Sequence, residues 1–203
     1  MRLSDRNWTI PNMLTIFRVL LTPVFVVFFM QERLYSALLT FGVAGLTDAL
    51  DGTIARVLHQ RSRLGAMLDP LADKTLLVTS FVCLAVKGWI PGWLAVIVVS
   101  RDVIIVGGLA VLSFFGVDIK GRIRPILISK VNTMAQMLLI LAVLGGRAFF
   151  ADRGETAGLP LVSSALAFVV AVLSVASGIL YIREWFGLFP NDGRNGNNNH
   201  PRP

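Results

Sequence analysis

The sequence has little charge and almost no cysteine. Of its 203 residues only 15% are charged, whereas 55% are hydrophobic, and the mean hydropathy is +0.70. A soluble domain carries about 25% charged and 45–50% apolar residues, so this composition excludes an ordinary soluble enzyme. The single cysteine, Cys83, excludes a disulfide framework, and we expect it to be a buried packing residue.

The sequence contains long apolar segments with few charged residues. Six of them are long enough to cross a bilayer as helices, at roughly 12–30, 35–55, 68–86, 91–115, 126–146 and 160–182. The runs follow one another closely, so we predict an all-α integral membrane protein with six transmembrane helices. The first run lacks a small-residue cleavage site, and we expect it to be retained as a span rather than removed as a signal peptide.

These runs also predict the domain organisation. Residues 1–185 are expected to form one membrane domain, which leaves no room for a soluble catalytic domain. Residues 186–203 are rich in Asn and Gly and have little to bury, so we predict a disordered cytoplasmic tail there. Any chemistry must therefore use helix ends and short loops.

The distribution of Lys and Arg predicts the orientation in the membrane. The loops on the N-terminal side hold eleven of them: Arg2, Arg6, Arg56, Arg61, Arg63, Lys120, Arg122, Arg124, Arg183, Arg194 and Arg202. The opposite loops hold four: Arg33, Lys87, Arg147 and Arg153. Cytoplasmic loops carry the excess of basic residues, so both termini are expected in the cytoplasm, as in a bacterial inner membrane.

The net charge of +7 is accordingly expected mainly on the cytoplasmic face. Such a face suits the membrane's own anionic lipids or phosphate-bearing substrates. Because the charge is fixed to a membrane surface, we expect no nucleic-acid partner.

The stretch from residue 48 to 73 is the most unusual part of the chain, because it places four carboxylates at the edges of two apolar runs. Asp48 and Asp51 are three residues apart, and Asp69 and Asp73 are four apart, so each pair projects from one face of a helix. Pro70 cannot donate a backbone hydrogen bond, and the third span is expected to begin or bend there.

Four clustered carboxylates need neutralisation. One carboxylate deep in a bilayer costs about 2.5–3.5 kcal/mol on insertion scales, and mutual repulsion adds to that. Hard divalent cations prefer oxygen ligands and are often shared with substrate phosphates. The pattern predicts a site for one or two metal ions at the cytoplasmic ends of spans two and three. The alternative is a solvated loop paired with nearby arginines, but Asp48 and Asp73 fall inside apolar runs.

The same stretch resembles the signature of the CDP-alcohol phosphatidyltransferase family, D-x2-D-G-x2-A-R-x8-G-x3-D-x3-D. All eight fixed positions match: Asp48, Asp51, Gly52, Ala55, Arg56, Gly65, Asp69 and Asp73. The resemblance extends to the six-span layout. It implies an enzyme that transfers a phosphatidyl group from CDP-diacylglycerol to an acceptor hydroxyl, with release of CMP.

The resemblance also implies the roles of these residues. Asp48, Asp51, Asp69 and Asp73 would surround two divalent metal ions, Mg²⁺ or Mn²⁺, and Asp73 would in addition be the general base. The cytidine and pyrophosphate site would be lined by Gly52, Ala55, Arg56 and Gly65. Family members are commonly homodimers, so a homodimer in contact with membrane lipids is implied as well.

The acceptor is left open between two alcohols. The N-terminal IPNMLTIFRVLLTP and the later DPLADK resemble the phosphatidylglycerophosphate synthase branch, whose acceptor is glycerol 3-phosphate. Residues 100–136 resemble the mitochondrial-type cardiolipin synthases, whose acceptor is phosphatidylglycerol. Arg18, inside the first apolar run, is expected either to reach the headgroup site or to extend to the surface.

Charged residues in the second half of the chain are the candidates for binding the acceptor: Arg101, Asp102, Arg122, Arg124 and Lys130. Ionisable residues inside a membrane segment suggest function. The structural alternative is an ion pair, Arg101–Asp102 or Asp102–Lys130, that only holds helices together. The remaining alternatives for the whole chain are another acceptor, such as inositol phosphate, and a membrane transporter or scaffold without enzymatic activity.

Overall fold

The computed structural model describes residues 10–58, 63–114, 127–150 and 159–188, and all of them fold into six α-helices or the turns between them. These are α1 (Ile10–Met30), α2 (Leu34–Leu58), α3 (Arg63–Val86), α4 (Gly92–Phe114), α5 (Leu127–Phe150) and α6 (Leu159–Leu188). The predicted all-α class and the six helices are confirmed. Each helix coincides with one of the six apolar runs, to within a few residues at most ends.

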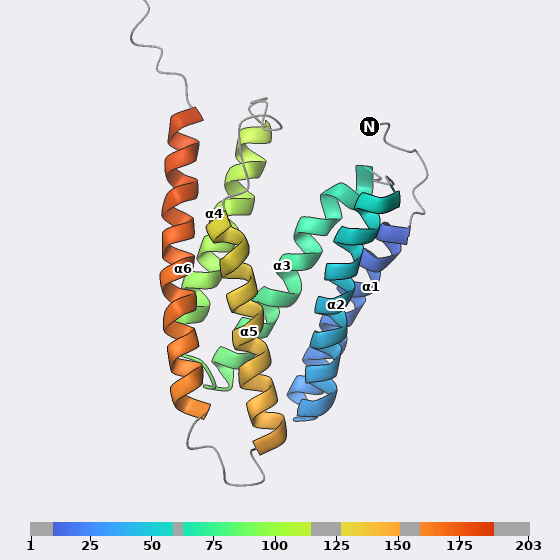
Figure 1. Cartoon of the computed structure of the whole chain (residues 1–203), viewed down its shortest axis with the longest axis vertical. Coiled ribbons are helices and arrows are strands. Elements are labelled where there is room, and N and C mark those ends of the chain that lie inside the picture. The colour runs from blue at the N-terminus through green and yellow to red at the C-terminus, as the bar shows by residue number, and fades with distance from the viewer. Residues whose placement is uncertain (1–9, 59–62, 115–126, 151–158, 189–203) are drawn as a thin grey trace, which may run out of the picture.

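Successive helices run in opposite directions along the long axis of the molecule (Figure 1). Helix α1 packs on α2 and α3, α4 packs on α3 and α6, and α5 lies between α2 and α6. The start of α1, the end of α2, the start of α3 and the end of α6 therefore lie at one end of the bundle (Figure 1). We call this the signature end, because α2 and α3 carry the eight signature residues beside it.

At the opposite end of the bundle, α1 and α3 end with the same C-terminal capping motif. After α1, Glu32 has a φ of 59°, and the Arg33 amide donates to the Phe28 carbonyl. After α3, Gly88 has a φ of 70°, and the Trp89 amide donates to the Leu84 carbonyl. Both are Schellman motifs, in which a left-handed residue turns the chain and satisfies the last carbonyls. They place short turns where the sequence changes from apolar to polar.

An ion pair joins these two turns. Lys87 Nζ donates to Glu32 Oε1 at 2.7 Å, and the guanidinium of Arg147 lies 5.2 Å from the centre of the Trp89 ring. The hydrogen bond from Lys87 lowers the pKa of Glu32 below its ordinary value. The ends of α1, α3 and α5 that lie away from the signature are thus held together by charge and by an aromatic ring.

The core is a column of aromatic and aliphatic side chains between α1, α2 and α3, extended by α4, α5 and α6. Phe25 stacks on Phe29 with 5.8 Å between ring centres, and Phe29 meets the edge of Trp89 at 5.3 Å. Cys83 is free and buried in this core, which confirms its predicted packing role. Outside the core, large apolar side chains such as Leu39, Val103 and Phe168 are exposed.

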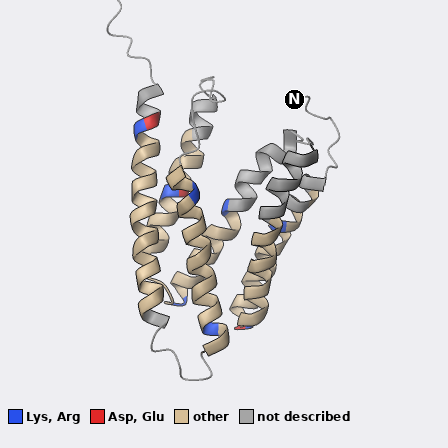
Figure 2. Ribbon diagram, in the orientation of Figure 1, with Lys and Arg blue, Asp and Glu red and all other residues tan. Residues whose placement is uncertain are grey.

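The exterior and the helix lengths are those of a membrane protein. Among the described residues, Leu127–Phe150 and Leu161–Glu184 are long and apolar enough to span a bilayer, and shorter apolar segments lie in α1, α2 and α3. Figure 2 shows charged residues near helix ends and at one level inside the bundle, with long uncharged stretches between them. Hydroxyls on these stretches, such as Thr40 and Ser80, donate to the carbonyl four residues earlier, which satisfies them without water.

Of the two outcomes expected for α3 at Pro70, a start or a bend, the start is excluded. The helix begins at Arg63, so Pro70 lies inside it rather than at its start. A proline removes only its own amide hydrogen bond from the helix, and the bonds on either side still form. The helix therefore extends past the apolar run, and Gly65 and Asp69 are helical residues.

Candidate active site

The backbone brings the two halves of the aspartate signature to the same end of the bundle. Asp48, Asp51, Gly52, Ala55 and Arg56 lie near the C-terminus of α2, and Gly65, Asp69 and Asp73 lie near the N-terminus of α3. Only residues 59–62 separate the two helices. The side chains of all eight lie outside the described part of the structure, so their predicted roles stay predictions.

The donor set of this signature fits a hard divalent cation. Four carboxylates in two helical pairs supply only oxygen ligands, which Mg²⁺ and Mn²⁺ prefer over nitrogen or sulfur. Spacings of three and four residues place the members of each pair on one helix face. The described part of the structure gives no coordination distances for them.

Of the acceptor-binding candidates, Arg101 and Asp102 are described in detail and lie inside the bundle. Both belong to α4, and each is only 3% exposed. Lys130, on α5, is exposed. Arg122 and Arg124 fall in residues 115–126, outside the described part of the chain.

A buried network, which we call the polar layer, joins four helices around Asp102. Its members are Lys74 of α3, Arg101 and Asp102 of α4, Ser129 of α5 and Ser177 of α6. Asp102 Oδ1 accepts from Lys74 Nζ at 2.7 Å and from an Arg101 guanidinium nitrogen at 2.6 Å. The other terminal guanidinium nitrogen of Arg101 donates to the hydroxyls of Ser129 and Ser177, at 2.6 and 2.8 Å. The layer holds α3, α4, α5 and α6 in register.

The polar layer settles which ion pairs form. The Arg101–Asp102 pair is present, whereas the expected alternative Asp102–Lys130 is replaced by Asp102–Lys74. Lys74 is 23% exposed at its side chain, and Lys130 lies on the exposed side of α5. The sequence analysis did not single out Lys74, although a lysine at the edge of an apolar run needs a carboxylate partner, and Asp102 is one.

A second buried contact extends the polar interior along α5 and α6. The Ser174 hydroxyl lies 3.1 Å from Asn132 Oδ1, and both residues are fully buried. Gln136, one turn further along α5, is also fully buried. Hydrogen bonds between side chains are a common way to pair helices inside a membrane.

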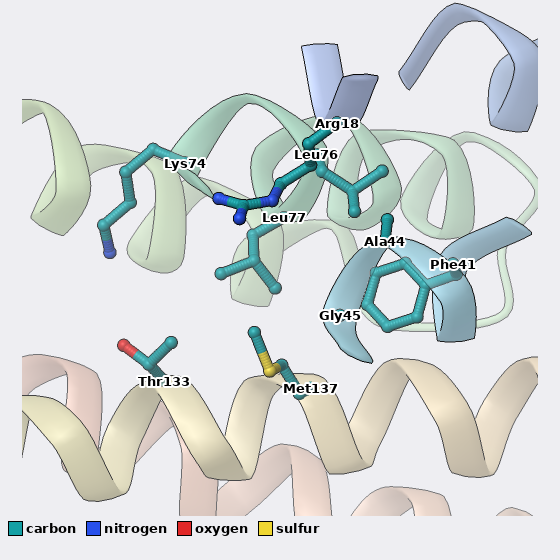
Figure 3. A pocket seen from close by; sticks show the side chains of 9 residues that line it. All are labelled: Arg18, Phe41, Ala44, Gly45, Lys74, Leu76, Leu77, Thr133 and Met137. Atoms are coloured by element: carbon teal, nitrogen blue, oxygen red, sulfur yellow. The ribbon is translucent and has the colours of Figure 1, made fainter. Parts of the chain in front are cut away.

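A cavity of about 160 Å³ lies between α1, α2, α3 and α5, and we call it the Arg18 cavity. Its lining residues are Arg18, Phe41, Ala44, Gly45, Lys74, Leu76, Leu77, Thr133 and Met137. Figure 3 shows the guanidinium of Arg18 and the aliphatic chain of Lys74 extending from the α1 and α3 side toward α5. Arg18 is only 2% exposed, so it does not extend to the surface, one of the two outcomes expected for it.

The comparisons with known proteins agree with the signature. A model of the CDP-alcohol phosphatidyltransferase family matches residues 8–183. The human protein named cardiolipin synthase (CMP-forming) is 39% identical over 165 residues, which is 74% of this chain and 55% of that protein. The Blochmanniella floridana protein named CDP-diacylglycerol–glycerol-3-phosphate 3-phosphatidyltransferase is 35% identical over 143 residues, 68% of this chain and 74% of that protein.

A third relative is the Mycobacterium tuberculosis protein named putative cardiolipin synthase, which is 38% identical over 112 residues. The matches to it and to the human protein span about half the length of each relative, 53% and 55%. The family match, in contrast, covers nearly all of the described helices and both halves of the aspartate signature. The chain belongs to the CDP-alcohol phosphatidyltransferase family.

Proposed function

We propose that this chain transfers a phosphatidyl group from CDP-diacylglycerol to the hydroxyl of a phosphoglycerol acceptor and releases CMP. The observation that carries the proposal is the complete eight-residue signature on two consecutive helices, at one end of a bundle that matches the family throughout. The names of the relatives give two acceptors: phosphatidylglycerol for the cardiolipin synthases and glycerol 3-phosphate for the Blochmanniella protein.

In the proposed reaction the acceptor oxygen attacks the phosphorus that carries diacylglycerol. A new phosphorus–oxygen bond forms, and the bond from that phosphorus to the bridging pyrophosphate oxygen breaks, so that its electron pair leaves with CMP. Asp73 takes the proton of the acceptor hydroxyl. Positioned general bases contribute about 10²–10⁴-fold.

Asp48, Asp51, Asp69 and Asp73 are proposed to hold two divalent ions, Mg²⁺ or Mn²⁺, which would neutralise the pyrophosphate and the leaving CMP. Gly52, Ala55, Arg56 and Gly65 are proposed to line the nucleotide site. The three residues without large side chains leave the backbone open to a flat base, and Arg56 supplies a cation for phosphate.

The acceptor is proposed to approach from the side of α4 and α5, where Arg101, Asp102, Arg122, Arg124 and Lys130 were predicted to bind it. Within the polar layer, Asp102 contacts both Arg101 and Lys74, and Lys74 is the residue that follows the proposed base. We therefore assign them a positioning role: they fix α4 and Lys74 beside the acceptor.

The setting of the enzyme is part of the proposal. We propose six transmembrane helices within a membrane domain of residues 1–185, a cytoplasmic tail at 186–203 and both termini in the cytoplasm of a bacterial-type inner membrane. We also propose a homodimer, as the family resemblance implies. The exposed apolar side chains of the described helices support the membrane setting.

Purified full-length protein with labelled CDP-diacylglycerol and Mg²⁺ tests the activity. Phosphatidylglycerol and glycerol 3-phosphate are offered separately, the lipid products are resolved and CMP is counted. We expect CMP release that requires the metal and one of the two acceptors. If neither acceptor yields CMP, both acceptor assignments fail, and inositol phosphate and other alcohols are tested next.

A further inference from the structure

Another pocket lies at the end of the bundle opposite the signature, between the start of α2 and the end of α5, and we call it the arginine pocket. Its volume is about 380 Å³, within the range of sites for small ligands. Its lining residues are Glu32, Arg33, Leu34, Tyr35, Ser36, Arg147 and Ala148. Ser36 precedes Asp48 by twelve residues on α2, about 18 Å at the usual helical rise, so this pocket is separate from the proposed reaction site.

The charges of the arginine pocket favour an anion. Figure 2 shows charged residues at this end of α2 and α5. Glu32 supplies the one carboxylate of the lining, and Lys87 already pairs with it at 2.7 Å. Arg33 and Arg147 add two positive charges, and within the described ranges neither guanidinium is paired with a carboxylate. A phosphate can accept hydrogen bonds from both guanidinium groups.

Local structure positions the two arginines. Arg147 belongs to the last turn of α5, and its guanidinium lies 5.2 Å from the centre of the Trp89 ring. A guanidinium on an aromatic face keeps its N–H donors in its own plane, where they can still bind an anion. Arg33 belongs to the turn before α2, and its carbonyl accepts from the Ala37 amide at 3.0 Å. The pocket thus draws one cation from each of two elements that pack against each other.

Apolar surface continues from the arginine pocket along the outside of α2 and α5. Tyr35 and Phe149 meet edge to face with 5.1 Å between ring centres, and both are more than half exposed. Further along α2, Leu39, Val43 and Leu46 are exposed at spacings of four and three residues, which places them on the same helix face as Tyr35. Aromatic side chains of this kind are enriched where a membrane meets water. A lipid with its headgroup in the pocket could lay its acyl chains along this face.

The occupant therefore has to match both the cations and the apolar face. A free phosphate would use the cations and leave the aromatic and apolar side chains without a contact. A phospholipid uses both, and basic pockets at the ends of membrane helices are known sites for anionic lipid headgroups. A zwitterionic headgroup would bring its own ammonium group close to the two guanidinium groups, which repel it. An anionic phospholipid fits best.

We propose that the arginine pocket binds the headgroup phosphate of an anionic glycerophospholipid, with Arg33 and Arg147 as its cationic contacts and the acyl chains along α2 and α5. This lipid is not a substrate, because the pocket and the signature lie at opposite ends of the bundle. The proposal does not rest on the transferase function. A ligand that binds only the folded protein stabilises it, so the site would make the stability of this end of the bundle depend on the lipid composition of the membrane.

Titration calorimetry on the purified full-length protein in a neutral detergent, without CDP-diacylglycerol, tests the site. The probe is short-chain phosphatidylmethanol, an anionic phospholipid whose headgroup has no hydroxyl and so cannot be an acceptor. Short-chain phosphatidylethanolamine and inorganic phosphate are the comparison probes. We expect saturable binding of phosphatidylmethanol and at least tenfold weaker binding of the other two. Equal affinity for either comparison probe, or no binding of phosphatidylmethanol, overturns the assignment to an anionic lipid.

Charge variants locate the binding. Arg33→Gln and Arg147→Gln should each weaken binding of phosphatidylmethanol about tenfold, because hydrogen bonds between charged groups are the strong ones. Glu32→Gln should strengthen it, because Lys87 then becomes available to the anion. Arg183→Gln is the matched control: it removes the same charge from an exposed arginine of α6, and affinity should stay within twofold. Affinity within twofold of wild type in both pocket variants, or an equal loss in Arg183→Gln, overturns the site.

Two features keep this test valid. Arg33 and Arg147 are exposed, so their substitution should leave the fold intact, and thermal unfolding of each variant without lipid checks this. If Arg147→Gln disturbs the fold by losing the contact with Trp89, Arg33→Gln still tests the pocket, because the cation over that ring is Arg147. Weaker binding in Glu32→Gln would contradict the charge argument, whether or not the protein releases CMP.

Discussion

At the scale of single residues, burial determines which of two ion pairs of similar length contributes more to the stability of the fold. Lys74–Asp102 and Lys87–Glu32 both have an N–O distance of 2.7 Å. Asp102 is 3% exposed and serves two cations, whereas Glu32 is 74% exposed at its side chain. Removing one partner of a buried pair leaves an uncompensated charge, while water replaces the lost partner of an exposed pair.

We therefore predict that Asp102→Asn destabilises the protein by about 3–5 kcal/mol, the usual cost of breaking a buried pair from one side. The neutral amide removes the carboxylate that Lys74 and Arg101 share. Unfolding of the purified protein, followed by circular dichroism as denaturing detergent is added, measures the change. Glu32→Gln is the matched control, and its effect should be clearly smaller. Similar losses of stability in the two variants would show that burial does not determine how much an ion pair contributes.

The Glu32 pair also has a predictable pH dependence. Its hydrogen bond to Lys87 lowers the pKa of the Glu32 carboxyl below its ordinary value of 4.5. A group whose pKa is lower in the folded than in the unfolded state contributes stability above the unfolded value and loses it as pH falls through the folded one. The stability difference between wild type and Glu32→Gln should thus be constant from pH 8 to about pH 5.5 and vanish in stronger acid. A difference that grows on acidification would contradict this sign.

For the proposed base, we predict that Asp73→Asn lowers kcat by at least 10²–10⁴-fold, because an amide cannot take the acceptor's proton. Binding of CDP-diacylglycerol should persist, since three signature carboxylates remain for the metal ions. Single-turnover CMP release and equilibrium binding of the donor measure the two effects separately. An equal loss of binding and of transfer would assign Asp73 chiefly to the metal site.

The candidate site could be predicted only in part from residues considered one at a time. The spacing of the four aspartates predicts two pairs on helix faces, and the structure places both pairs near one end of the bundle. The partner of Asp102 could not be predicted in this way. Lys74 and Lys130 are both 28 residues from Asp102, one before it and one after it, so sequence separation does not distinguish them. Only the packing of α3 against α4 decides between them.

At the scale of the helix, α5 shows how a membrane segment divides its two faces. Leu139 is fully buried, whereas its neighbour Leu138 is 57% exposed. Lipid tails are as apolar as leucine, so removing an exposed leucine from a membrane helix loses little. A buried leucine loses its packing contacts and leaves a cavity, whatever the solvent outside.

We accordingly predict that Leu139→Ala costs about 2–5 kcal/mol, and that Leu138→Ala has an effect near zero. The two leucines are adjacent on the same helix, at the same depth, so the difference between the stability losses of the two variants measures the contribution of packing. Detergent-induced unfolding of both variants gives the two values. A cost for Leu138→Ala as large as that for Leu139→Ala would mean that the outer face of α5 is covered, as it would be at a dimer interface.

Helix positions could be predicted well from the apolar runs, because a run long enough to cross a bilayer can satisfy its backbone only as a helix. The apolar run of the third span begins at residue 68, five residues after the observed start of α3 at Arg63. The residues from Arg63 to Asp69 are not uniformly apolar, and the helix there continues beyond the hydrophobic run. Apolar runs show where a helix is buried or meets lipid, and they do not show how far its polar end extends.

At the scale of the whole molecule, the even number of helices places the start of α1 and the end of α6 at the same end of the bundle (Figure 1). The polar layer lies at an intermediate depth, and the Lys87–Glu32 pair lies at the opposite end. In the proposed orientation the signature end meets the cytoplasm, where a soluble nucleotide leaves, and the donor lipid enters between helices from the bilayer. One orientation thus accounts for a lipid donor and a water-soluble product.

We predict from this orientation that both termini are accessible from the cytoplasm and that the turn after α1 is accessible from the other side. The one native cysteine, Cys83, is buried, so single cysteines can be introduced as reporters with little background. Ser4→Cys and Asn195→Cys should react with a membrane-impermeant maleimide in inside-out vesicles and not in intact cells. Gln31→Cys, at an exposed turn position, should show the opposite pattern.

The three reporters together test the helix count as well as the direction. Labelling of the two termini from opposite sides would require an odd number of crossings, and one of the six helices would then lie along the membrane surface. Labelling of both termini from outside would preserve the six crossings and invert the molecule. The signature aspartates would then face away from the cytoplasmic pool of nucleotides, and the proposed reaction could not draw on it.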